Sequence, residues 1–114
     1  MIVEERIYTL QPGKTGEYIK TYEQEGLAIQ KPILGRMVGY YFTEIGALNL
    51  LIHMWAYEDL AERDARRAVL VADARWQAYI KKVQPFLLQQ ENRILKPAPF
   101  FAATLDAMAQ VAQR

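Results

Sequence analysis

The segment Leu48–Tyr57, LNLLIHMWAY, carries the strongest structural signal in the chain. It reads as a β-strand, in which successive side chains point to opposite faces of a sheet. One face is an unbroken aliphatic set: Leu48, Leu50, Ile52, Met54 and Ala56. The other face is mixed: Asn49, Leu51, His53, Trp55 and Tyr57. We expect the aliphatic face to pack against helices and the mixed face to point away from them.

The residues before this strand predict a strand, a helix and a second strand. Ile2–Leu10 alternates apolar and polar side chains, and residues 11–14 (QPGK) favour a type II turn. Thr15–Lys31 has helical spacing of apolar residues, and Pro32 is expected to end that helix. Leu34–Glu44 is rich in β-formers and is expected to join Leu48–Tyr57 in a hairpin through residues 45–47.

The residues after this strand predict a split helix and a short final strand. Asp59 and Asp73 have the character of N-caps, and Pro85 is expected to end the helical pattern near Gln84. Asn92–Lys96 reads as the last strand. The order is therefore β-α-β-β-α-β, the ferredoxin-like arrangement of an α+β protein with a four-stranded antiparallel sheet.

The length of 114 residues fits one domain, which we place at residues 1–100. Residues 101–114 form a C-terminal tail that is either helical or disordered. Nothing at the N-terminus resembles a signal peptide, and the longest uncharged run, Ile45–Tyr57, is too short for a membrane helix. We therefore expect a cytoplasmic protein without membrane insertion.

Composition excludes several function classes. The 14 basic and 13 acidic residues give a net charge of +1, which provides no field for binding nucleic acid. The chain has one histidine and no cysteine, so we expect no metal site and no cofactor. It has no serine either, which excludes a serine nucleophile.

The mixed face of Leu48–Tyr57 predicts a homodimer with a ligand pocket. Large aromatic side chains on an open sheet favour association, and a second copy of the sheet would cover them. The first strand alternates in the same way, with Glu4, Arg6 and Tyr8 on one face. The side chains predicted to bind a small, partly apolar or anionic ligand are Arg6, Tyr8, Asn49, His53 and Trp55.

Two of these residues, His53 and Asn49, are candidates for catalysis. The imidazole would accept or donate a proton, and the amide would donate a hydrogen bond. A structural role is the alternative for His53, with a bond to a dimer partner or to Glu44. Arg6 would bind a carboxylate or phosphate, or else form an interior ion pair with Glu4 or Glu44.

A further set of arginines follows Asp59. Arg63, Arg66 and Arg67 form either an anion-binding patch or a solvated helix face. Arg63 and Arg67 are like charges four residues apart on one helix, so an acidic partner would relieve their repulsion.

Several short motifs together resemble the NIPSNAP family. The first runs Glu4-x-Arg6-x-Tyr8-Thr9-Leu10-x-Pro12-Gly13. The middle ones are Val38-Gly39-Tyr40, Thr43-Glu44-Ile45-Gly46-x-Leu48-Asn49 and His53-x-Trp55-x-Tyr57, followed by Arg63 and Arg67. The last are Trp76, Pro85, Gln90-Glu91 and Ile94-Leu95-x-Pro97. The resemblance covers about residues 3–100 and implies a dimeric α/β barrel whose biochemical activity is undefined.

Two alternatives remain beside a ligand-binding NIPSNAP-like protein, so whether the chain is an enzyme stays open. Some small cofactor-independent monooxygenases and haem-degrading enzymes with such a barrel place Asn, Trp and His in the pocket, an analogy of fold and residue type. The other alternative is a protein-interaction module whose barrel is filled by its own side chains. An interior void favours ligand binding or catalysis, and a solid interior favours the interaction module.

Overall fold

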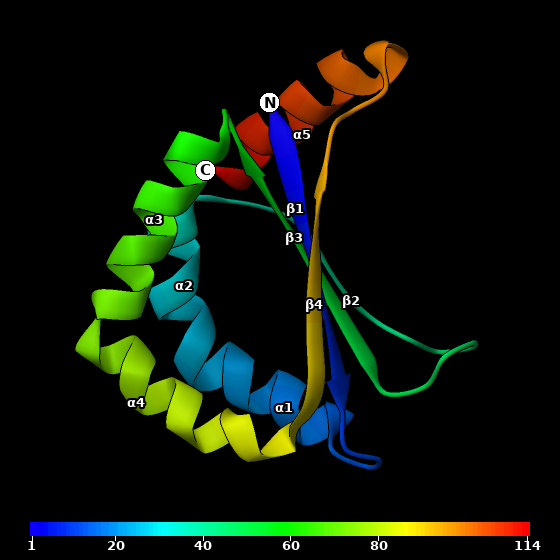
Figure 1. The fold of residues 1–114 in the computed structure, drawn as a ribbon, viewed down its shortest axis with the longest axis vertical. Helices are drawn as coiled ribbons and strands as arrows, with labels where there is room; N and C mark the ends of the chain where they lie inside the picture. The colour runs from blue at the N-terminus through cyan, green and yellow to red at the C-terminus, as the bar shows by residue number, and fades with distance from the viewer.

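The computed structural model describes all residues from Met1 to Arg114 and confirms the α+β, ferredoxin-like architecture. Its four strands form one antiparallel sheet in the order β2-β3-β1-β4. Figure 1 shows that α1 to α4 cover one face of this sheet as an arc. We call this the inner face and the opposite one the outer face. The strands are β1 (Ile2–Leu10), β2 (Arg36–Phe42), β3 (Leu50–Tyr57) and β4 (Leu87–Leu95).

The two N-caps predicted on the second helical segment are both confirmed. The Asp59 side chain accepts a hydrogen bond from the Glu62 backbone N–H at 2.8 Å and begins α3 (Leu60–Ala72). The Asp73 side chain likewise accepts from the Arg75 N–H and begins α4 (Ala74–Val83). A 3₁₀ turn containing Pro85 follows α4 and leads into β4, so this proline ends the helix as expected.

The first helical segment departs from the prediction at two places. It consists of α1 (Thr15–Thr21), a π-helical turn (Tyr22–Gly26) and α2 (Leu27–Leu34), and so continues past Pro32. Pro32 removes one backbone donor, but burial of Leu34 beyond it favours the last turn, which ends at Gly35 with φ of 94°.

The π-helical turn has a glycine at a close approach of two aromatic rings. A Cβ atom on Gly26 would lie 2.8 Å from a ring carbon of Tyr22 and 2.8 Å from a ring carbon of Tyr79. Only glycine therefore allows both rings to pack over the helix at this point. The turn directs Tyr22 into the interior, where it is buried.

The hairpin of β2 and β3 is confirmed, but its strands are shorter than predicted. The loop spans residues 43–49, and Asn49 belongs to this loop, with φ of 65°. Asparagine adopts this left-handed conformation more readily than most residues. The strand therefore begins at Leu50, because Asn49 turns the chain into it.

The C-terminal part is more ordered than the sequence indicated. The last strand, β4, begins at Leu87 and so is longer than predicted, and nearly all its side chains are exposed. The tail forms α5 (Ala102–Ala112), which packs on the outer face with Leu105 and Ala109 against Ala56. None of the helices has the combined length and apolarity that a bilayer crossing requires.

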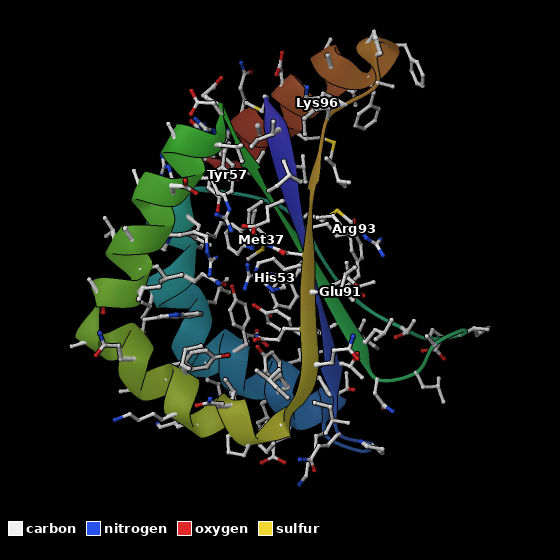
Figure 2. The ribbon with its side chains drawn as sticks, in the orientation of Figure 1. Met37, His53, Tyr57, Glu91, Arg93 and Lys96 are labelled. Carbon is white, nitrogen blue, oxygen red and sulfur yellow. The ribbon has the colours of Figure 1, made fainter.

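The predicted orientation of β3 is wrong. Its mixed set Leu51, His53, Trp55 and Tyr57 lies on the inner face and is buried, and Figure 2 shows His53 and Tyr57 directed towards the helices. Of the aliphatic set, Leu50, Ile52 and Met54 are half-buried on the outer face and Ala56 lies under α5. The prediction failed because it assigned the aliphatic face to the helices and left the tail out of the packing.

Candidate functional site

The buried carboxylate of Glu4 is the centre of a polar cluster between β1 and the helices. Its side chain is 0% exposed. A single oxygen, Oε2, accepts hydrogen bonds from Arg6 Nη1 at 3.2 Å, Arg63 Nη2 at 2.7 Å and Asn92 Nδ2 at 2.8 Å. The donors come from β1, α3 and β4, so the carboxylate ties three elements together. It is the interior ion-pair partner that the sequence analysis offered for Arg6.

The Glu4 carboxylate is held in its ionised form. Burial by itself would raise its pKa, but the hydrogen bonds from Arg63 and Asn92 and the charge of Arg6 outweigh burial and lower it to about 2. The group is therefore negative throughout the physiological range.

Positive charge exceeds negative charge around Glu4. Arg67 of α3 is half-buried, and its Nη1 has no hydrogen-bond partner. Burial, together with the positive charge of the neighbouring Arg6, lowers the pKa of Arg67. Arg63 also donates to the exposed Asp64 at 2.8 Å. Three guanidinium groups thus face two carboxylates, and one positive charge is left uncompensated.

His53 of β3 is a neutral hydrogen-bond donor in this environment. Its side chain is 2% exposed, and Trp55 Nε1 donates to its Nδ1 at 2.7 Å. The proton of the neutral ring therefore lies on Nε2, which has no partner. Burial, together with the charges of Arg6 and Arg67, lowers the pKa of His53 to about 3. The imidazole does not act as a base through Nδ1, because Trp55 occupies that nitrogen.

His53 also lines a small cavity on the inner face. The cavity has a volume of about 30 Å³, room for about two water molecules. Tyr22 donates to Gln30 Oε1 at 2.7 Å in its wall, and Tyr40 stacks on both Tyr22 and His53. We call it the tyrosine-lined cavity; its walls are Tyr8, Tyr18, Tyr22, Gln30, Tyr40, His53, Trp76, Ile80, Leu87 and Gln90.

The inner face concentrates buried polar atoms that have no partner within the chain. They include Glu4 Oε1, Arg63 Nε, Arg67 Nη1, His53 Nε2, Tyr57 Oη and Tyr79 Oη. Buried polar atoms are normally hydrogen-bonded, so a concentration of unpaired ones marks a place for ordered water or a ligand. No group of three or more His, Asp or Glu side chains is placed to coordinate a metal ion.

Four of the five predicted ligand-binding residues come together on the inner face. Arg6 Nε donates to Tyr8 Oη at 3.0 Å, the Tyr8 ring packs edge-on against His53 at 5.0 Å, and Trp55 follows through its bond to His53. Asn49 is not among them, since its backbone carbonyl only accepts from the Leu10 N–H at the end of the hairpin.

Asn92 and Tyr57 were not among the predicted site residues. Tyr57 shares the strand face of His53 and Trp55, so the same alternation could have identified it. Asn92 offered no such signal, because its role depends on the pairing of β4 with β1. Arg63 and Arg67, for which two readings were open, face the interior cluster, with Glu4 as the acidic partner of Arg63.

The fold and this inner polar cluster define a single-sheet α+β domain of the ferredoxin-like class. A family model described as NIPSNAP matches residues 3–102. The chain is 33% identical over 103 residues to protein NipSnap homolog 1 of Danio rerio, covering 84% of this chain and 34% of that protein. This chain belongs to the NIPSNAP family, and it spans about a third of the length of that curated relative.

Solved structures show the same fold. An uncharacterized NIPSNAP-like domain protein from Burkholderia xenovorans is 51% identical, with a TM-score of 0.86 over 87% of this chain and 86% of that one. A putative antibiotic biosynthesis monooxygenase from Nitrosomonas europaea is 12% identical, with a TM-score of 0.63 over 85% of this chain and 98% of that one. The second likeness concerns the fold alone.

Proposed function

We propose that this chain binds a small anionic molecule between its sheet and its helices, and that Arg67 supplies the free charge. The observation that carries the proposal is the surplus guanidinium group, which leaves Arg67 Nη1 buried without a partner. A buried charge without a partner destabilises the folded protein. An anion that binds at this position would therefore also stabilise the fold. A single surplus charge favours a monoanion such as a carboxylate.

The anion would enter at the edge between α3 and β4. Arg6 and Arg63 keep 15% and 22% of their side-chain surface exposed, and β4 beside them is exposed along nearly its whole length. The body of the ligand would then displace water and the half-buried Tyr40 from the tyrosine-lined cavity.

Substitution of Arg67 by glutamine tests this proposal. We expect butanoate or benzoate to bind the wild type and to bind Arg67→Gln at least about tenfold more weakly, because a charge-assisted hydrogen bond contributes about 1.5–3 kcal/mol. Isothermal titration calorimetry measures both affinities. Arg93→Gln is the matched control: it removes the same charge from β4, where Arg93 is exposed and points away from the helices (Figure 2). Equal binding by all three proteins contradicts the proposal.

A filled interior would favour the interaction module instead. The tyrosine-lined cavity supports this alternative, because its volume of about 30 Å³ leaves no preformed space for an organic ligand. Failure of every anion to bind the wild type would favour this second function.

We also propose that two copies of the chain associate through their outer faces. Leu50, Ile52 and Met54 give this face an apolar centre without a covering helix. Beside them, an apolar groove of about 460 Å³ runs between α5 and the sheet. A symmetric dimer covers such a face with an identical one, which neutralises an otherwise exposed apolar patch.

Native mass spectrometry tests the dimer. We expect the wild type to be a dimer and Ile52→Lys to be a monomer, because a lysine at the centre of the interface would be buried without a partner. Ala78→Lys, on the exposed surface of α4, adds the same charge and should remain a dimer. A monomeric wild type at micromolar concentration would contradict the proposal.

A further inference from the structure

We propose that His53 donates a hydrogen bond through Nε2–H to an uncharged or anionic oxygen of the ligand. The ligand would then be a small carboxylate that carries a carbonyl, enolate or phenolate oxygen one or two carbons from the carboxyl group. This inference rests on the proposed function, because it needs the carboxylate at the arginines, and it adds a second point of recognition on β3.

The donor nitrogen of His53 is fixed in place. Trp55, 0% exposed, occupies Nδ1 of His53 with its indole N–H, so the other ring nitrogen carries the proton. His53 lines the tyrosine-lined cavity, and Trp55 does not. Because Trp55 occupies Nδ1, Nε2 is the ring nitrogen that is free to bind a ligand. Trp55 acts as a positioning residue, which sets the tautomer without contacting the ligand.

His53 also lies beside one of the arginines, Arg6, in the sheet. Arg6 and His53 are directly opposite each other in the pairing of β1 with β3. Side chains opposite each other on one face of an antiparallel pair have Cβ atoms about 4.5–5.5 Å apart. Tyr8 closes the arrangement, since its hydroxyl accepts from Arg6 and its ring packs against His53. From this proximity we infer that a ligand contacting both sides has its two oxygen functions close together, on neighbouring or next-neighbouring carbons.

The unpaired donor of His53 would also make the site selective among ligands. His53 Nε2–H is buried without a partner, among the aromatic rings of Tyr8 and Tyr40. A site that leaves a polar group unpaired discriminates strongly between a ligand that satisfies it and an analogue that does not. An uncharged donor in a water-poor site also stabilises negative charge that develops on an enolate or phenolate oxygen. 2-Oxo acids and 2-hydroxybenzoates have the required pair of oxygens.

Nitrogen NMR of the wild-type protein tests the donor directly. The chain has a single histidine, so ¹⁵N-histidine labelling reports one imidazole. We expect the Nε2–H tautomer from pH 5 to pH 9, and a shift of the Nε2 signal on addition of 2-oxobutanoate but not of butanoate. The Nδ1–H tautomer, a charged ring at pH 6, or equal response to both acids would overturn the inference. This measurement needs no variant and so does not depend on a variant that folds.

Calorimetry with the same two acids tests the class of ligand. We expect the wild type to bind 2-oxobutanoate about tenfold or more tightly than butanoate, and His53→Phe to bind the two alike. Trp55→Phe should lower the affinity for 2-oxobutanoate but not for butanoate, because without the indole N–H the proton of His53 is no longer fixed on Nε2.

The outcomes separate this inference from the proposed function. Equal affinities in the wild type, both weakened by Arg67→Gln, would overturn the role of His53 and keep the anion site. No binding of either acid would overturn both.

Discussion

Replacement of Glu4 by alanine should lower the free energy of unfolding by about 3–5 kcal/mol, because it removes the partner of a buried charge cluster. Arg6 and Arg63 would lose the carboxylate to which they donate, and Asn92 would lose its acceptor. Three guanidinium groups would then repel one another beneath α3. Urea unfolding at pH 7, followed by tryptophan fluorescence, measures the change.

Glu17→Ala provides the control, on the exposed surface of α1. Glu17 forms a solvent-exposed pair with Lys14 at 3.4 Å. Because exposed ion pairs contribute about 0–1 kcal/mol, its loss should cost no more than that. Anions should stabilise Glu4→Ala more than the wild type, since they replace the missing carboxylate. Equal stability of the two alanine variants would show that Glu4 does not balance the arginines.

Mild acid should destabilise the protein through His53. The pKa of this imidazole is about 3 in the folded protein and about 6.5 in the unfolded chain, so the unfolded chain binds the proton first. The stabilisation that comes from neutral His53 is therefore fully present above pH 6.5 and is lost as the pH falls towards 3. Between pH 7 and pH 5 the expected loss is about 2 kcal/mol. Urea unfolding at a series of pH values gives the slope.

His53→Phe should remove the pH dependence in this window. The lowered pKa of Glu4 acts at lower pH, since its stabilisation is present above pH 4.5 and is lost as the pH falls towards 2. The variant should therefore have a flat stability between pH 7 and pH 5, and below pH 4.5 it should lose only the stabilisation that comes from Glu4. An unchanged slope in His53→Phe would mean that another group is responsible.

Local patterns predicted the elements well because their causes are local. Capping by Asp59 and Asp73 depends on a side chain and a backbone amide two or three residues away. The π-helical turn was missed since its cause is distant: Gly26 makes room for Tyr79, which comes from α4. Pro32 was given too much weight for the same reason, because burial of Leu34 is a tertiary effect.

The faces of the sheet could not be read from alternation alone. Period-two spacing sorted the residues of β3 correctly into two sets, but it does not state which set faces the helices. The polar set is buried because partners arrive from far along the chain: Arg63 and Asn92 reach Glu4 across 59 and 88 positions. The face was expected to need a second subunit to cover it, but these partners from the same chain form hydrogen bonds with it instead. Alternation placed Arg6, Tyr8, His53 and Trp55 on one face, where the structure also has them, whereas Asn49 lies in the turn before β3.

The two edges of the sheet present different side chains to solvent. Residues 89–93 of β4, with the sequence QQENR, present exposed amides and charges along one edge, which discourages another strand from pairing there. The opposite edge, β2, carries exposed Tyr41 and Phe42 at its end and no charge after Arg36. We therefore expect cross-β association of a partly unfolded chain to begin at β2 rather than at β4.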